Sequence, residues 1–323
     1  MIGTPSFTQI YSGMLAELQK AIQGLDATLE TVLVGFLSGG HLLFEGVPGV
    51  GKTLMANALA RSFQGSFSRI QFTPDLMPSD ILGTSVYRMS PGGGKEWDFQ
   101  FKPGPIFANV VLADEINRAA PKTQSALLQA MQEETVTADG VNHPLPHPFF
   151  VIATMNPIEL QGTFPLPEAQ LDRFLMKIVV PYPDSSSERD LLRNHPGVGH
   201  LDALLEGIQP VVIPEALNDL RQAYRSVVVK DEVLDYVHKI LLETRKSRWL
   251  MLGASPRAGI HLFSAAKVYA LTQGRDFVTP DDIKALILPI LRHRIVLRPE
   301  AQIEGITPDG ILTELLNSIP VPR

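Results

Sequence analysis

A glycine-rich segment carries the strongest chemical signal in the sequence. It runs from Gly46 to Thr53 with the spacing G-x-x-x-x-G-K-T, after an apolar run and before a helix-like stretch, Leu54 to Phe63. Glycines at these positions let backbone N–H groups turn toward phosphate oxygens, and the N-terminus of a helix favours their negative charge. A glycine-rich turn with a solvated lysine is the competing interpretation, but it explains neither the preceding strand nor the following helix.

We predict that this loop binds ATP. Lys52 is expected to reach the β- and γ-phosphates, and Thr53 is expected to ligate Mg²⁺. The predicted nucleotide-binding residues are Gly46, Val47, Pro48, Gly49, Val50, Gly51, Lys52, Thr53 and Leu54.

Two adjacent carboxylates end the apolar run Val110–Ala113. Asp114 and Glu115 would stand at the C-terminal end of a strand, where open α/β sheets place their ligands. Asp114 is predicted to hold the Mg²⁺ shell, and Glu115 is predicted to orient and deprotonate the attacking water. This division needs one acid near the metal and one near the γ-phosphate. An acidic pair that only caps the following helix is the alternative.

Asn156 ends a third apolar run and precedes a proline. Its amide can donate and accept hydrogen bonds at once, so it is predicted to position the water or to sense the γ-phosphate. An asparagine that only satisfies a turn at the end of the strand is the alternative.

Arg173 stands at the end of a predicted helix, just before the fifth apolar run. In a ring of subunits it would face the neighbour's nucleotide, and an arginine supplied in this way can raise the rate of phosphoryl transfer by about 10³- to 10⁵-fold. An internal salt bridge with Glu168 or Asp172 is the alternative. Arg118 is a second residue that could contact a neighbouring subunit, with a solvated helix start as the alternative.

Arg257 opens a helix in the second half of the chain. Ser255 is the predicted N-cap and Pro256 the first helical residue, so Arg257 should project toward the phosphates and report the nucleotide state. A surface arginine without such a role is the alternative.

Short apolar runs alternate with helix-like stretches through the first half of the chain, which predicts an α/β fold with a parallel sheet covered by helices. Two longer stretches, Thr73 to Gly104 and Val136 to Pro148, are predicted to be inserted hairpins or loops, and the first carries the turn Pro91–Gly94. The five predicted strands are His41–Glu45, Ser68–Phe72, Val110–Ala113, Phe149–Thr154 and Lys177–Val180.

The composition of the sequence changes at Pro181–Ser187, a segment rich in proline and serine, and strand-like runs largely disappear after it. We therefore predict two domains, a P-loop αβα core over residues 1–183 and an all-helical lid over residues 184–323. Within the lid, Thr279-Pro280-Asp281-Asp282 combines an N-cap, a proline at the first helical position and an acid at the third.

Composition narrows the class of protein. The 323 residues are 45% hydrophobic and 19% charged, as in an ordinary globular protein, and the net charge of −6 does not favour nucleic acid as a partner. The chain has no cysteine, which excludes disulfides and thiolate sites. It also lacks a leader-like N-terminus and any apolar run near the roughly 20 residues of a membrane span. A cytoplasmic protein is expected.

Taken in chain order, these motifs resemble those of the AAA+ ATPases. Gly46–Thr53 resembles Walker A, Val110–Glu115 Walker B, Ala153–Pro157 sensor 1, Leu171–Phe174 the arginine finger and Ser255–Arg257 sensor 2. The resemblance covers the chain from about Ile22 onward.

Three longer strings resemble one branch, the MoxR family: Arg69–Asp80, Asp114–Ala119 and Gln161–Phe174. This resemblance implies a hexameric ring that remodels or activates partner proteins, often together with a protein that carries a von Willebrand factor A domain. It also implies that the two insertions are the helix 2 insertion and the hairpin before sensor 1. One departure is Gly24-Leu25-Asp26, where relatives commonly carry Gly-Gln-Glu near the adenine.

Two other classes of function stay open at this point. A nucleotide-gated scaffold would bind ATP and hydrolyse it negligibly, and single-turnover hydrolysis would distinguish it. A DNA-directed motor of the helicase or clamp-loader type would show salt-sensitive DNA binding, which the acidic charge balance disfavours.

Overall fold

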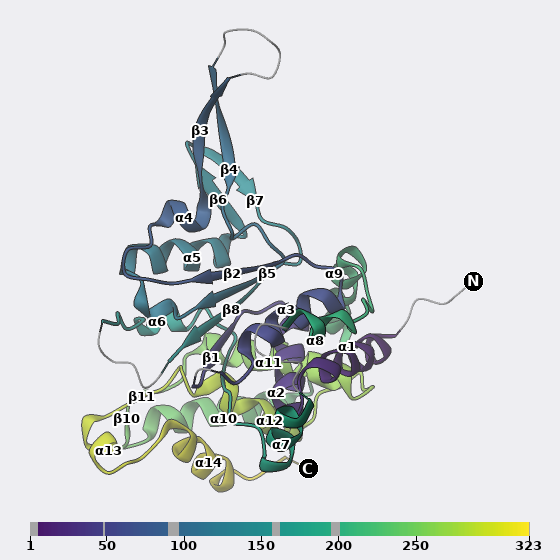
Figure 1. Cartoon of the computed structure of the whole chain (residues 1–323). Coiled ribbons are helices and arrows are strands. Elements are labelled where there is room, and N and C mark those ends of the chain that lie inside the picture. Colours follow the sequence, from purple (N-terminus) through teal and green to yellow (C-terminus); the bar gives the residue numbers. More distant parts are fainter. Residues whose placement is uncertain (1–5, 48, 90–96, 157–161, 195–200, 323) are drawn as a thin grey trace.

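The computed structural model describes residues 6–47, 49–89, 97–156, 162–194 and 201–322. Its centre is a five-stranded sheet whose strands are all parallel (Figure 1). The strands lie in the spatial order β2 (Phe67–Gln71), β5 (Val110–Asp114), β8 (Phe150–Met155), β1 (Leu42–Glu45) and β9 (Met176–Val179). The predicted α/β class and all five predicted strands are confirmed, each to within one residue at either end.

Side chains of the central strands alternate between two apolar interiors, as the two-residue period of a strand requires. Leu112 and Ile152 belong to the interior shared with α3 (Lys52–Ser62), whereas Val111 and Val151 belong to the interior shared with α5 (Pro121–Glu133). Helices α1 (Phe7–Ala21) and α2 (Asp26–Leu37) complete the first face, and α4 (Pro78–Leu82) lies beside α5 on the second. The central strands are therefore buried on both faces, which explains their continuous apolar runs.

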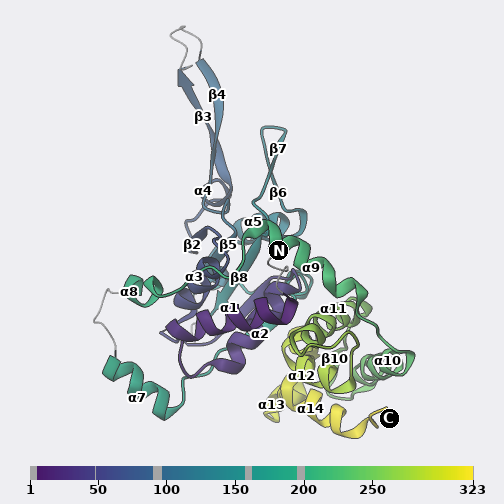
Figure 2. The ribbon, with the colours of Figure 1, turned by 90° about the vertical axis from the view of Figure 1, so that its right-hand side faces the viewer.

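Both predicted insertions are antiparallel hairpins, and they project from the same end of the molecule (Figure 2). The first pairs β3 (Gly83–Met89) with β4 (Trp97–Pro103), and the second pairs β6 (Thr135–Ala138) with β7 (Val141–Pro144). The turn Pro91–Gly94 lies outside the described residues.

The two hairpins contact each other through side chains. The ring of His143 in β7 stacks on Phe101 in β4, with 3.9 Å between ring centroids and 15° between ring planes. The hydroxyl of Ser85 in β3 donates a hydrogen bond to the carboxylate of Asp139 in the second hairpin. This stacking gives His143 a packing role, and the described residues include no cluster of three potential metal ligands.

Helices dominate the chain after the sheet. Figure 2 shows α9 leading from the core to the lid helices α10 to α14, whereas α8 packs against α1 and α3 of the core. The elements are α6 (Glu168–Leu171), α7 (Ser185–Asn194), α8 (Leu201–Glu206), α9 (Pro214–Gln222), α10 (Asp231–Lys246), α11 (Pro256–Thr272), α12 (Pro280–Leu291), α13 (Pro299–Ile303) and α14 (Pro308–Ser318), with 3₁₀ turns at Ile116–Arg118 and Ala223–Ser226.

The lid differs from the all-helical prediction in one detail. Two short strands, β10 (Leu250–Leu252) and β11 (Val296–Leu297), form an antiparallel pair between its helices. The runs are only three and two residues long, too short to show a strand period in the sequence. The predicted helix start at Thr279 is confirmed, because Thr279 and Asp282 cap each other's backbone N–H groups.

Core and lid share one apolar interior. The interior on the α3 face of the sheet continues without interruption into α10, α11 and α12, and α11 contacts both α1 and α2. The hydroxyl of Thr8 donates to the carbonyl oxygen of Leu271 at 3.0 Å, which joins α1 directly to α11. The helical lid is therefore packed onto the N-terminal helices as well as joined to the core by the chain.

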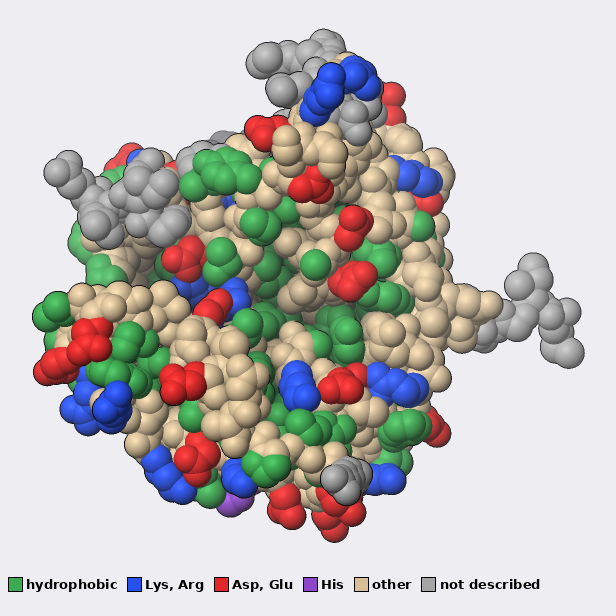
Figure 3. Space-filling model, turned by 90° about the horizontal axis from the view of Figure 1, so that it is seen from below, with side chains coloured by type: hydrophobic (Ala, Val, Ile, Leu, Met, Phe, Trp, Pro, Cys, Tyr) green, Lys and Arg blue, Asp and Glu red, His purple; other side chains and the backbone are tan. Residues whose placement is uncertain are grey.

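On the lid side of the molecule, acidic and basic side chains are interspersed (Figure 3). No basic stripe of the kind that tracks a nucleic acid backbone is visible on that face, in keeping with the net charge of −6. None of the helices in the described part of the chain combines the length and the apolar character that crossing a bilayer would need.

A buried histidine connects the sheet to α5. The Nε2–H of His41 donates to the carbonyl oxygen of Met131, and its Nδ1 accepts from the N–H of Val151, both at 3.0 Å. Burial lowers the pKa of His41 to about 4. Burial also lowers the pKa of His261 to about 4 and that of His293 well below its ordinary value.

We expect the free energy of unfolding to fall as the pH drops from about 6.5 to about 4. The folded-state pKa values lie below the unfolded value of about 6.5, so the unfolded chain binds more protons in this window. His41 alone is expected to cost about 2 kcal/mol between pH 7 and pH 5. Urea unfolding at several pH values measures this slope, His41→Gln should reduce it, and His238→Gln at an exposed histidine of α10 should not. A flat profile to pH 5 would contradict the expectation.

Candidate active site

The phosphate-binding loop joins β1 to α3 through two glycines with left-handed backbones. Gly49 has φ of 85° and Gly51 has φ of 81°, a region that other residues adopt only with strain. Gly51 is the N-cap of α3, so Lys52 is the first residue of the helix. Pro48, a predicted member of the loop, lies outside the described residues.

Gly46 is a glycine for a different reason, namely close approach. A Cβ at this position would stand 2.8 Å from the carbonyl oxygen of Val180, just beyond β9. The N–H of Val180 donates to the carbonyl oxygen of Glu45 at 2.8 Å, so the end of β9 holds the start of the loop. The side chains of Val47, Val50 and Leu54 pack into the interior beneath the loop, which leaves its backbone as the surface for phosphates.

Lys52 lies within electrostatic reach of both predicted acids. Its Nζ donates to the carbonyl oxygen of Gly46 at 2.9 Å. Burial lowers the pKa of Lys52, while the charges of Asp114 and Glu115 act in the opposite direction. Thr53 follows in the first turn of α3 and is partly buried. The structure thus brings the loop and the two carboxylates to one edge of the sheet.

The carboxylate of Asp114 is held by neighbours on both sides in the sheet. Its Oδ1 accepts from the hydroxyl of Thr154 in β8 at 2.6 Å. Its Oδ2 accepts from Nη2 of Arg69 in β2 at 2.6 Å and from Nε at 3.2 Å. Two adjacent strands therefore fix the orientation of this carboxylate.

Glu115 leaves the strand with a left-handed backbone, φ of 57°. Its N–H donates to the Thr154 hydroxyl at 2.9 Å, so one threonine positions both acids. Its Oε2 accepts from Nε2 of Gln71 at 2.8 Å and pairs with Nε of Arg118 at 3.0 Å. A non-glycine residue at positive φ is uncommon. At the carboxyl end of a parallel strand, this backbone conformation supports the hypothesis of a functional role for Glu115.

Asn156 directly follows β8, on the strand between those that carry the loop and the acids. Its side chain is buried, with 8% of the residue exposed. The strand order therefore places all three predicted core elements at neighbouring carboxyl ends, where parallel sheets bind ligands.

Arg173 lies beyond the end of α6, which is shorter than predicted and stops at Leu171. Its Nη1 donates to the carbonyl oxygen of Leu128 in α5 at 2.7 Å. Glu168 and Asp172 were the alternative partners considered for it, and Asp172 instead pairs with two lid arginines: Arg294 at 2.7 Å and Arg257 at 3.4 Å.

Arg257 stands in the first turn of α11 as predicted. Ser255 caps the helix by accepting from the N–H of Ala258 at 3.3 Å. The side chain of Arg257 is 60% exposed and reaches the core at Asp172. Its exposure leaves the guanidinium able to turn toward another anion.

Three residues that hold the acids carry no predicted role: Arg69, Gln71 and Thr154. Arg69 and Gln71 lie on one face of β2 because they are two positions apart, and Thr154 is a polar residue inside an apolar strand. Such breaks in the apolar pattern are the signal that could have identified them.

The donor set fits Mg²⁺ bound to a nucleotide. A carboxylate and a hydroxyl are hard oxygen ligands, and Mg²⁺ in phosphate-transfer sites takes one or two protein ligands besides phosphates and water. Thr53 and Asp114 would hold the ion.

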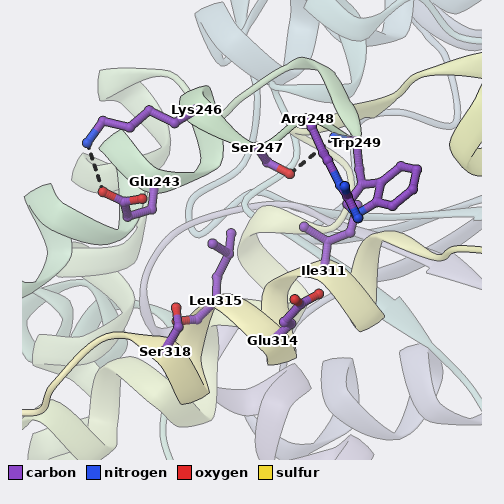
Figure 4. A pocket seen from close by; sticks show the side chains of 9 residues that line it. All are labelled: Glu243, Lys246, Ser247, Arg248, Trp249, Ile311, Glu314, Leu315 and Ser318. Atoms are coloured by element: carbon purple, nitrogen blue, oxygen red, sulfur yellow. Dashed lines mark hydrogen bonds and ion pairs between the residues drawn. The ribbon is translucent and has the colours of Figure 1, made fainter.

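A separate pocket of about 320 Å³ lies in the lid (Figure 4). It is lined by residues from the end of α10 and from α14, with the guanidinium of Arg248 above the ring of Trp249 at 4.4 Å. None of the predicted nucleotide-binding residues lines it.

Comparisons with known proteins agree with this geometry. The profile of the "ATPase family associated with various cellular activities (AAA)" matches residues 41–176, and that of the "AAA lid domain" matches residues 242–315. Chaperone MoxR1 of Mycobacterium tuberculosis is 43% identical over 321 residues, which cover 95% of this chain and 81% of that protein. This chain belongs to the MoxR family of AAA+ ATPases.

Two further relatives of this MoxR-family chain cover most of its length. Uncharacterized protein YeaC of Bacillus subtilis is 47% identical over 294 residues, 90% of this chain and 88% of that protein. The crystal structure of a candidate ATPase from Cytophaga hutchinsonii superposes with a TM-score of 0.89 at 38% identity, covering 98% of this chain and 96% of the other. The MoxR fold, core and lid together, is thus the fold of this chain.

Proposed function

We propose that this MoxR-family protein hydrolyses ATP in a Mg²⁺-dependent reaction at the carboxyl edge of its sheet. The observation that carries the proposal is that Lys52 lies near the two acids Asp114 and Glu115. The hydroxyl of Thr154 holds these two acids together. ATP would lie between the core, residues 1–183, and the lid, residues 184–323.

Each residue has a distinct part in the proposed reaction. The loop N–H groups and Lys52 bind the phosphates, and Asn156 orients the attacking water. Mg²⁺, when bound by Thr53 and Asp114, neutralises charge on the phosphates. The water oxygen attacks the γ-phosphorus as its proton passes to Glu115, and the bond from that phosphorus to the bridging oxygen breaks, which yields ADP and phosphate.

We further propose that the active form is a ring, a homo-hexamer, in which Arg173 of one subunit completes the neighbour's site. The energy of hydrolysis would serve to remodel or activate partner proteins in the cytoplasm, among them a protein with a von Willebrand factor A domain. The name of the relative MoxR1, a chaperone, supports a protein substrate.

Lys52→Ala tests nucleotide binding, the first step of this proposal. The lysine would make charge-assisted hydrogen bonds to two phosphates, so its loss should weaken ATP binding by about 100-fold, or roughly 3 kcal/mol. Isothermal titration calorimetry with Mg²⁺ and ATP measures the change. Lys284→Ala, at a lysine of α12 that pairs with exposed Asp281, is the matched control and should bind like the wild type. Equal affinity of the two variants for ATP would contradict the role assigned to Lys52 in phosphate binding.

A further inference from the structure

An arginine on the edge strand β2 binds the carboxylate that is assigned to Mg²⁺. Arg69 donates to Oδ2 of Asp114 through Nη2 at 2.6 Å and through Nε at 3.2 Å. Both bonds are charge-assisted, which is the stronger class of hydrogen bond. The hydroxyl of Thr154 takes the other oxygen, Oδ1, at 2.6 Å. Arg69 therefore occupies the carboxylate oxygen that remains for a metal ion.

The two partners of this ion pair differ in their exposure to water. The side chain of Asp114 is 15% exposed, whereas that of Arg69 is 49% exposed. A carboxylate that is largely removed from water requires a counter-charge. The exposed guanidinium, in contrast, can leave the carboxylate with little loss of packing. Arg69 is thus a cation that the site can exchange for another cation.

Gln71 keeps the guanidinium of Arg69 in this place. The Oε1 of Gln71 accepts from Nη2 of Arg69 at 2.9 Å, and the same nitrogen donates to Asp114. Arg69 and Gln71 lie two positions apart on one face of β2, and β2 pairs with β5, which carries Asp114. All three residues belong to the sheet, so a single subunit contains the whole arrangement.

Other cations near the two acids bind elsewhere. Lys52 is attracted by the charges of Asp114 and Glu115, but its Nζ donates to the carbonyl oxygen of Gly46. Arg118 pairs with Glu115 at 3.0 Å. Arg69, in contrast, bonds directly to the carboxylate of Asp114. Its charge is therefore the one that a metal ion at this carboxylate meets at closest range.

We propose that Arg69 takes the place of Mg²⁺ at Asp114 and thereby lowers the affinity of the protein for the ion. The inference rests on the proposed function, in which Asp114 helps to hold Mg²⁺. An incoming ion competes with the guanidinium for Oδ2 of Asp114 and is repelled by its like charge. The two acids therefore hold less Mg²⁺ until a nucleotide supplies further negative charge and further oxygen ligands.

A metal titration of the nucleotide-free protein tests the inference. Mn²⁺ binds the same oxygen ligands as Mg²⁺, and electron paramagnetic resonance measures its uptake directly. Arg69→Gln removes the charge and keeps a long polar side chain, so it should bind Mn²⁺ about three- to tenfold more tightly than the wild type. Arg69→Lys keeps the charge and should stay within about twofold of the wild type. Mg²⁺ should displace the bound Mn²⁺ from each protein.

Three further variants assign the measured uptake to this carboxylate. Asp114→Asn, added to Arg69→Gln, removes the charge that attracts the ion and should abolish the gain in affinity. Arg225→Gln, at an exposed arginine of the 3₁₀ turn Ala223–Ser226, removes the same charge at a distance and should bind Mn²⁺ like the wild type. Thermal unfolding in the absence of metal verifies that each variant is folded. If Arg69→Gln does not fold, Arg69→Ser admits water to the carboxylate and should show the same gain.

The outcomes separate the inference from the function beneath it. Tighter Mn²⁺ binding by Arg69→Gln, lost again with Asp114→Asn, supports the role of Arg69. Equal affinities of Arg69→Gln and the wild type would overturn it, as would an equal gain in Arg69→Lys, because charge would then not be the cause. Absence of uptake by all variants would overturn it as well. Calorimetry of the wild type with ADP and Mg²⁺ tests the proposed function separately, since failure to bind the nucleotide would contradict that function whatever the Arg69 variants do.

Discussion

Replacing Arg173 with alanine is expected to lower ATP turnover of the assembled protein by about 10³- to 10⁵-fold. The reason is that the guanidinium would stabilise charge on the transferring phosphate of a neighbouring subunit. Steady-state hydrolysis at a protein concentration that permits assembly measures the loss. Binding of ATP to the single subunit should be unchanged, because Arg173 donates within its own subunit to the Leu128 carbonyl oxygen and not to the loop.

Two controls accompany the Arg173 variant. The lost hydrogen bond to Leu128 should cost about 1 kcal/mol of unfolding free energy, which leaves the protein folded. Arg225→Ala, at an exposed arginine between α9 and α10, removes the same charge and should hydrolyse ATP at the wild-type rate. Turnover that is independent of protein concentration in the wild type would speak against a site completed by a neighbour.

Glu115→Gln should lower turnover by about 10²- to 10⁴-fold while ATP binding persists, because the amide cannot take a proton from the attacking water. The substitution keeps the shape of the side chain, and the N–H bond to Thr154 belongs to the backbone and is retained. Rapid-quench single-turnover hydrolysis, with binding measured by calorimetry, separates the two effects.

The matched control for Glu115→Gln is Glu133→Gln at the exposed end of α5. It should leave turnover unchanged. Full turnover by the Glu115 variant would show that another group activates the water. If the wild type itself binds ATP and hydrolyses none in a single turnover, the nucleotide-gated scaffold is the better description.

Much of the fold could be predicted because local rules and tertiary structure agree. The apolar runs at Leu42–Glu45 and Val110–Asp114 are buried on both faces, so their composition alone identifies them as strands. The caps at Ser255 and Thr279 act within one helical turn, and local sequence suffices to locate them.

The contacts that orient the acids could not be predicted in the same way. Arg69 reaches Asp114 only because β2 lies beside β5, and Thr154 reaches both acids only because β8 lies on the other side. Strand order is a tertiary property, and 45 residues separate Arg69 from Asp114. The pairing of Asp172 with Arg294, across 122 residues, depends on lid docking and has no local signal at all.

The structure of a single subunit does not test the predicted contact of Arg118 with a neighbouring subunit. The residue was expected either to contact a neighbouring subunit or to stand at a solvated helix start. In the structure it lies in the 3₁₀ turn after Glu115 and pairs with that carboxylate at 3.0 Å. A role at a subunit boundary stays a prediction.

The apolar interior shared by core and lid leaves the molecule without a seam. A lid joined to the core only by a hinge could open widely. Here, wide opening would separate α11 from α1 and α2 and expose their apolar surface to water. Packed helices tolerate small sliding far better than separation. We therefore expect nucleotide binding and hydrolysis to move the lid helices by a small sliding displacement and not by wide opening of the lid.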